Sequence, residues 1–139
     1  MITHLKQRTS GQRLYEITAD VARIVQRWAK ETETRRSGLC TIFVRHTSAS
    51  LVIQENADPS ARHDLERWLE RLVPENDPLF THTSEGPDDM PAHVKAALTA
   101  TSLTIPIDNG KLVLGTWQGI YLWEHRTAPH TRHVVVQCS

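Results

Sequence analysis

Short runs of β-branched and apolar residues outnumber the helix-like segments of this sequence, and the two kinds of segment do not alternate regularly. Regular alternation is typical of parallel βαβ units, so its absence favours an antiparallel or mixed sheet. We therefore predict an α+β fold with a largely antiparallel sheet and about three helices. A length of 139 residues suits a single domain, residues 1–139.

Three segments carry helix signals. The first follows Thr18, a candidate N-cap, and ends before Gly38; the second starts at Asp58-Pro59, an N-cap with proline at the first helical position, and ends at Pro74. The third, Pro91 to Ala100, follows two acids whose charge suits a helix N-terminus. The apolar stripes of the first two are Val21, Ile24, Val25 and Trp28, and Leu65, Trp68, Leu69 and Leu72.

Two pairs of strand-like runs are separated by turn residues. Leu5–Thr9 and Leu14–Ile17 flank Ser10-Gly11, and Leu103–Ile107 and Lys111–Leu114 flank Asn109-Gly110, so both pairs are predicted to be hairpins. Further strands are predicted at 39–45, 50–53, 120–123 and 133–136. Residues 75–90 have little periodicity and are predicted to form a long functional loop.

Charge and composition exclude several classes of function. The formal net charge is zero and the pI is about 7.1, which disfavours a nucleic-acid partner. No apolar stretch has the length of a signal peptide or membrane span, so a cytoplasmic protein without a membrane partner is expected. The sequence has no Gly-rich phosphate-binding loop, so no nucleotide cofactor is expected. Cys40 and Cys138 lie in strand-like runs and are expected to be buried, reduced thiols.

Histidines at the ends of the predicted elements are candidate metal ligands. His46, His82 and His93 come from three segments, and three imidazoles with an open fourth position form a known catalytic zinc arrangement. Their spacing does not place two ligands on one helix, so the hypothesis requires proximity in the fold. The alternative is that each histidine satisfies ordinary hydrogen bonds.

Carboxylates and an amide around the second helix are further candidates, each with a structural alternative. Asp58 suits an N-cap, and Asp64 lies in the first turns, where a negative charge complements the helix dipole. Asn56 can donate and accept hydrogen bonds beside a strand end, or simply form a turn.

A polar face is predicted between residues 116 and 126. If this segment is extended, Thr116, Gln118, Glu124 and Arg126 point to one side, and aromatic residues point to the other. The polar side is either solvated or lines a ligand or subunit cleft, and the core is expected on the aromatic side.

Three stretches resemble the YjbQ-like family, some members of which are described as secondary thiamine-phosphate synthases. They are HTSASLVIQENADPSARHDLERWLERLVPEN, HTSEGPDDMPAHVKAAL and TSLTIPIDNGKLVLGTWQGIYLWEHR. The resemblance implies a compact α+β fold and a homotrimer. It also implies a polar cluster of His46, Asn56, Asp58, Asp64, His82, Glu85 and His93, joined by Thr116, Gln118 and Glu124. His63 and His125 are weaker candidates for this cluster, because their motifs occur in only part of the family.

Three functions remain open. A thiamine-phosphate-synthase-like enzyme acting on phosphorylated small molecules would hold Mg²⁺ on Asp58, Asp64 or Glu85 and would meet phosphate with Arg126 or Arg45. A metal-dependent hydrolase would bind Zn²⁺ through His46, His82 and His93 and would use Glu85 or Glu124 as general base. A non-enzymatic trimer would bind a metal or a small ligand through the same residues.

Overall fold

The computed structural model describes residues 1–34 and 36–139 and contains the predicted mixture of strands and helices. The elements follow the order β1 (Ile2–Thr9), β2 (Arg13–Glu16), α1 (Thr18–Glu31), β3 (Gly38–Val44), β4 (Ala49–Glu55), α2 (Pro59–Leu72), α3 (Asp89–Leu98), β5 (Ser102–Asp108), β6 (Lys111–Leu112), β7 (Gln118–Glu124) and β8 (His130–Cys138). The predicted α+β class is therefore confirmed.

The strands form two antiparallel sheets. A five-stranded sheet has the order β1-β8-β3-β5-β6, and a three-stranded sheet has the order β2-β7-β4. The hairpin predicted around Asn109-Gly110 is confirmed as β5 and β6. The hairpin predicted around Ser10-Gly11 is wrong, because β1 pairs with β8 while β2 pairs with β7. Gly11, with a φ of 97°, instead lets the chain cross from one sheet to the other.

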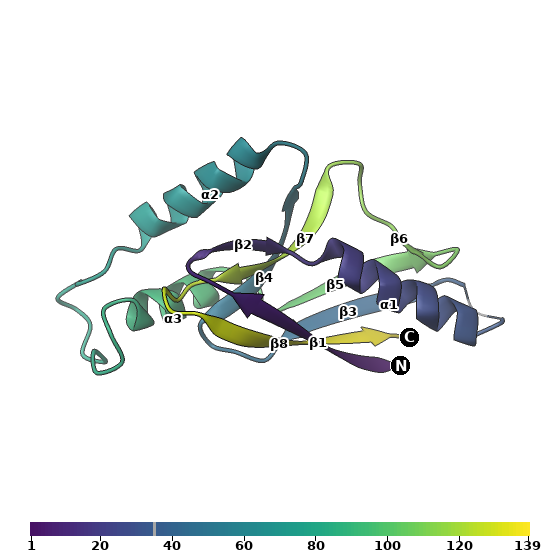
Figure 1. Ribbon diagram of the computed structural model, residues 1–139, viewed down its shortest axis with the longest axis horizontal. Coiled ribbons are helices and arrows are strands. Elements are labelled where there is room, and N and C mark those ends of the chain that lie inside the picture. Colours follow the sequence, from purple (N-terminus) through teal and green to yellow (C-terminus); the bar gives the residue numbers. More distant parts are fainter. Residues whose placement is uncertain (35) are drawn as a thin grey trace.

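The main core lies between α1 and the sheets. Figure 1 shows the α1 helix running across the strands. The stripe predicted for α1 is confirmed, since Val21, Ile24, Val25 and Trp28 are all buried. They pack with residues of both sheets, including Ile42, Ile105, Ile120, Val134 and Val136. The two chain ends run side by side, and the Met1 ammonium group donates to the Cys138 carbonyl over 3.0 Å.

β7 is buried on both faces, which differs from the prediction of one polar and one apolar side. Ile120 and Leu122 enter the main core, whereas Tyr121 and Trp123 enter a smaller cluster with Leu14, Leu69 and Val73. Thr116 and Arg126 lie outside the strand, which covers only residues 118–124, so the predicted alternation of side chains does not extend to them. β7 is central in its sheet and covered on both sides, which explains its continuous apolar run.

The predicted N-cap of α2 is confirmed: the Asp58 carboxylate accepts from the Ser60 backbone N–H over 2.9 Å, and Pro59 opens the helix. The α2 helix projects from the rest of the molecule in Figure 1. Only Leu69 of its predicted stripe is fully buried, while Trp68 and Leu72 are 50% and 51% exposed.

The α3 helix starts earlier than predicted, at Asp89 rather than Pro91. Proline has no backbone N–H, but the first turn of a helix needs none, so Pro91 fits inside that turn. This shift places Asp89 and His93 one helical turn apart.

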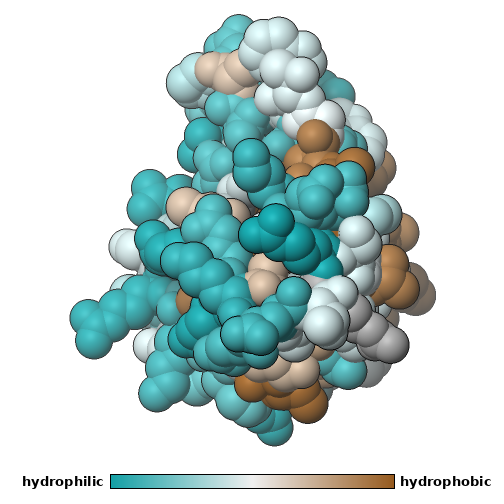
Figure 2. Space-filling view, turned by 90° about the vertical axis from the view of Figure 1, so that its right-hand side faces the viewer, coloured by the Kyte–Doolittle hydropathy of each residue, from teal (hydrophilic) through white to brown (hydrophobic). Residues whose placement is uncertain are grey.

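Figure 2 shows a largely hydrophilic side with separate apolar patches. Among the described residues, no helix is long and apolar enough to cross a membrane. Cys40 and Cys138 are buried, free thiols, as expected from the sequence. They lie at paired positions of β3 and β8.

Candidate metal centre

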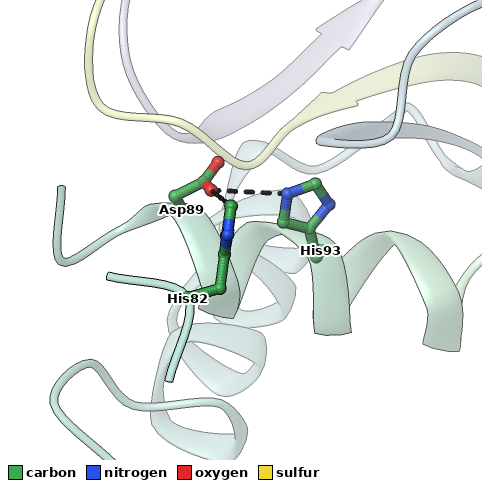
Figure 3. A group of neighbouring side chains, drawn as sticks. All are labelled: His82, Asp89 and His93. Carbon is green, nitrogen blue, oxygen red and sulfur yellow. Dashed lines mark ion pairs between the residues drawn. The ribbon is translucent and has the colours of Figure 1, made fainter. Parts of the chain in front are cut away.

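His82, Asp89 and His93 bring three potential ligand atoms together at the start of α3. The Nε2 atoms of His82 and His93 lie 3.0 and 3.4 Å from Oδ2 of Asp89. All three ligand atoms lie within 4.8 Å of one another. Figure 3 shows both rings directed toward the same carboxylate.

Local structure explains this convergence. Asp89 and His93 are four residues apart on α3, so they lie on the same face of the helix. His82 comes from the loop before the helix, as Figure 3 shows. Within this loop Gly86 has a φ of 108°, a conformation that favours glycine and turns the chain back toward α3.

The spacing of the ligand atoms suits a tetrahedral metal. Nitrogen and oxygen ligands bind zinc at about 2.0–2.2 Å, which places neighbouring tetrahedral ligands roughly 3.3–3.6 Å apart. The two contacts to Asp89 Oδ2 are close to this spacing. Three protein ligands would leave a fourth position, and the 51% exposed side chain of His82 keeps the centre open to solvent.

The Oδ2 atom of Asp89 has two imidazole nitrogens as ion-pair neighbours but no hydrogen-bond donor among the described residues. The Asp89 side chain is 2% exposed, and Oδ2 is a buried atom with no hydrogen bond to any described residue. A buried carboxylate oxygen is costly unless it is hydrogen-bonded, ion-paired or bound to a metal. Because two imidazole nitrogens face the same oxygen, a shared cation would satisfy all three groups.

Arg126 holds the other oxygen of Asp89. Its Nη1 donates to Asp89 Oδ1, its Nε to Asp88 Oδ2 and its Nη2 to the Glu85 carbonyl, each over 2.8 Å. The guanidinium therefore fixes the Asp89 carboxylate and leaves Oδ2 directed toward the histidines. Such partners commonly orient metal ligands.

Asp88 completes this supporting layer. Burial would raise the pKa of Asp88, but hydrogen bonds from Arg126 and the Thr127 backbone N–H lower it overall. The hydrogen bond to Asp88 in turn raises the pKa of Arg126. Both groups therefore remain charged near neutral pH.

His46 does not join this centre within the chain. Its Nε2 accepts from the backbone N–H of His133 over 2.8 Å, and its Nδ1 lies 3.4 Å from Arg132 Nη1. The imidazole also stacks against His133 with a centroid distance of 5.8 Å. The proposed set of three histidines is therefore not formed in one chain, and Asp89 takes the third place.

Glu124 is a buried structural anion. Its carboxylate accepts from Thr9, from two nitrogens of Arg132 and from the backbone N–H groups of His125 and Arg126. Burial would raise the pKa of Glu124, but the hydrogen bonds from Arg132 and Thr9 lower it overall. Both properties disfavour the role of general base, which needs an accessible oxygen.

Asn56 and Gln118 lie elsewhere, at adjacent ends of β4 and β7. Asn56 Nδ2 donates to Glu16 Oε2 over 3.2 Å, and Gln118 Oε1 accepts from the Gly115 backbone N–H over 2.7 Å. Thr116 is exposed in the loop before β7. The Asn56 backbone N–H also donates to the Trp117 carbonyl over 3.0 Å, so these three residues gather at the loop before β7 and do not belong to the histidine centre.

The remaining predicted carboxylates are exposed. Asp58 caps α2, and the hydrogen bonds with Ser60 lower its pKa. Asp64 borders a shallow depression on α2 with Arg67, Trp68 and Arg71. Glu85 lies in the His82 loop, and its carboxylate makes no hydrogen bond or ion pair with the described residues.

The comparisons with known proteins agree along nearly the whole chain. A family model described as "UPF0047 protein YjbQ-like" matches residues 3–139. The chain belongs to the YjbQ-like UPF0047 family. A UPF0047 protein of Synechocystis is 53% identical over 94% of this chain and 86% of the relative. UPF0047 protein YjbQ of Escherichia coli O157:H7 is 47% identical over 70% of each chain.

Solved structures extend this agreement to the fold. A conserved hypothetical protein of Thermus thermophilus, TT1486, has a TM-score of 0.84 at 32% identity, covering 99% of both chains. A YjbQ/UPF0047-family protein of Clostridium acetobutylicum has a TM-score of 0.82 at 34% identity, covering 100% of this chain and 99% of the other. None of these names states a reaction.

Proposed function

We propose that this YjbQ-like protein is a metal-dependent hydrolase that holds a zinc-class ion on His82, Asp89 and His93. The observation that carries the proposal is the buried Asp89 Oδ2, which accepts no hydrogen bond from the described residues and faces two imidazole nitrogens. Two histidines and one carboxylate with an open position form a ligand set of known catalytic metal sites.

The ligand types favour a transition metal over Mg²⁺. Mg²⁺ prefers oxygen ligands in octahedral geometry, whereas imidazole suits zinc and its neighbours. Asp58, Asp64 and Glu85, the carboxylates considered for Mg²⁺, form no described cluster of three ligand groups.

The ion and the residues around it would have different roles in hydrolysis. When bound, the ion would lower the pKa of water to about 7 and polarise a carbonyl. Glu85, the exposed carboxylate of the His82 loop, is the proposed general base. Arg126 acts as a positioning residue, because it holds Asp89 in place.

A small cavity beside His82 indicates the kind of substrate. It has a volume of about 210 Å³, and Phe80, Pro87 and Met90 contribute apolar walls. No lysine or arginine lines it, so it suits an apolar group better than a phosphate. We propose small esters or amides with an apolar substituent as substrates.

Transfer chemistry of the thiamine-phosphate-synthase type has weaker support at this centre. It requires cationic groups to stabilise the leaving pyrophosphate. Arg126, one candidate for that role, already directs its Nε, Nη1 and Nη2 to protein oxygens.

The homotrimer implied by the family resemblance is also part of the proposal. Trp68 and Leu72 leave a half-exposed apolar face on α2, which self-association would cover. Light scattering should give a mass near three times 15.8 kDa; a monomeric mass would remove this part of the proposal.

Hydrolysis by metal-free and zinc-loaded protein tests the central proposal. We expect the zinc-loaded protein to hydrolyse p-nitrophenyl acetate and p-nitrophenyl butyrate, and His93→Ala to fall to the metal-free rate. His63→Ala, which changes an exposed histidine of α2 outside the centre, should retain the activity. Zinc binding without turnover of any ester or amide would instead favour a non-enzymatic metal-binding protein.

A further inference from the structure

The turn between β3 and β4 forms one wall of a second depression. Its volume is about 540 Å³, and it is lined by Phe43, Val44, Arg45, His46, Thr47, Ser48 and Thr101. No carboxylate belongs to this lining, which contains a guanidinium and three hydroxyl groups. The volume falls in the range of small-molecule sites.

The turn carries unused hydrogen-bond donors. The Arg45 side chain is exposed and makes no hydrogen bond or ion pair with the described residues. The backbone N–H groups of His46, Thr47 and Ser48 likewise have no acceptor among those residues. Consecutive free N–H groups beside a guanidinium favour an anion.

Buried contacts hold the turn in place from below. Arg132, only 3% exposed, donates through Nη2 to the carbonyl and the hydroxyl of Ser48 over 3.2 and 3.0 Å. On the other side, the His133 backbone N–H donates to His46 Nε2 over 2.8 Å. The turn is thus fixed by the β8 strand before any ligand arrives, which reduces the entropy cost of binding.

Arg45 is the main source of accessible positive charge. Burial, with further contributions from Arg132 and His133, lowers the pKa of His46, so its imidazole is neutral at pH 7. The buried Arg132 is paired with Glu124. A ligand in the depression therefore meets one unpaired guanidinium.

We infer that this turn binds the phosphate group of a phosphorylated small molecule. A tetrahedral phosphate has enough acceptor oxygens for the Arg45 fork and several N–H and hydroxyl donors together, whereas a carboxylate has only two oxygens. Phe43, 47% exposed at the same depression, offers an apolar surface to the rest of the ligand. The inference goes beyond the proposed hydrolase and does not rest on its metal.

Calorimetric titration with phenyl phosphate, inorganic phosphate and benzoate tests this site. We expect phenyl phosphate to bind more tightly than inorganic phosphate, and benzoate to bind weakest. Arg45→Gln should weaken phosphate binding by roughly ten- to hundred-fold, the usual effect of losing a charged hydrogen bond. The matched control is Arg71→Gln, which removes an exposed arginine of α2 and should leave the affinity unchanged.

Three results would overturn the inference. They are no phosphate binding at millimolar concentration, equal binding by folded Arg45→Gln protein, and tighter binding of benzoate than of phenyl phosphate. His93→Ala separates the two sites: it should retain phosphate binding, and its loss would place the phosphate at the metal centre. Zinc affinity should be the same in Arg45→Gln and wild type.

Discussion

At the scale of single residues, Asp89 connects the proposed chemistry with the fold. Its Oδ2 atom faces His82 and His93, while its Oδ1 atom accepts a hydrogen bond from Arg126. The orientation of one carboxylate thus depends on an arginine that contributes no ligand atom. A change at Arg126 should therefore alter metal affinity through the position of Asp89.

We predict that Arg126→Lys lowers zinc affinity by roughly ten- to hundred-fold, as observed when outer partners of metal ligands are replaced. Lysine keeps the positive charge but lacks the planar fork that joins Asp88, Asp89 and the Glu85 carbonyl. Competition with a chromophoric zinc chelator measures the affinity. Arg71→Lys serves as the control, and equal zinc affinity in both variants would count against the positioning role.

Two of the three proposed ligands can be found from the sequence, and the third cannot. His82 and His93 are imidazoles in motif positions, whereas the sequence pattern indicates only that Asp89 is a charge before a helix that starts at Pro91. Because the helix starts at Asp89, the four-residue spacing between Asp89 and His93 places both side chains on one helix face. The separation of His46 from both could not be predicted, because it depends on tertiary packing.

At the scale of elements, the sequence predicts correctly those features that depend on interactions between residues close in the chain. The α1 stripe, the Asp58 cap and the β5–β6 turn all depend on residues close in sequence. Strand pairing between β1 and β8 joins residues at opposite ends of the chain, so a plausible turn at Gly11 led to a false hairpin. Gly110 of the β5–β6 turn lies against Ala29 of α1.

We predict that Gly110→Ala destabilises the protein more than Gly11→Ala does. Both glycines have positive φ values, 73° and 97°, where a side chain costs about 1–2 kcal/mol. An added Cβ at Gly110 would also lie 2.9 Å from the Ala29 Cβ of α1, whereas at Gly11 the nearest atom is 4.0 Å away. Urea unfolding of the two variants measures the difference in the free energy of unfolding. Equal losses of stability would show that α1 can shift away from the added methyl group without destabilising the protein.

At the scale of the whole molecule, Glu124 joins the two sheets. It lies on β7 of the three-stranded sheet, and its partners Thr9 and Arg132 lie on β1 and β8 of the five-stranded sheet. The same carboxylate accepts from the Arg126 backbone N–H, next to the candidate metal centre. Loss of its charge should therefore affect global stability.

We predict that Glu124→Gln lowers the unfolding free energy at pH 7 by about 3–5 kcal/mol, because the buried Arg132 loses its counter-charge. The pKa of Glu124 is lowered from its ordinary value of 4.5, so the folded state binds fewer protons than the unfolded state. This stabilisation is present above pH 4.5 and is lost as pH falls through the lower, folded-state pKa.

Urea unfolding at pH 7 and across the acid range measures both effects. Wild type should lose more stability than Glu124→Gln on acidification below pH 4.5, because the variant lacks this titrating group. Glu31→Gln, at the exposed end of α1, should retain the wild-type behaviour. Parallel acid profiles for wild type and Glu124→Gln would contradict the assigned role.

The most direct test of the metal centre is zinc titration of metal-free protein, followed by calorimetry and by the shift of Tm. We predict about one ion per chain and a rise in Tm through binding to the folded state. Both effects should be lost in Asp89→Ala and His93→Ala and kept in His63→Ala. Zinc binding of the same stoichiometry and affinity in Asp89→Ala and His93→Ala, or no binding to wild type, would contradict the centre.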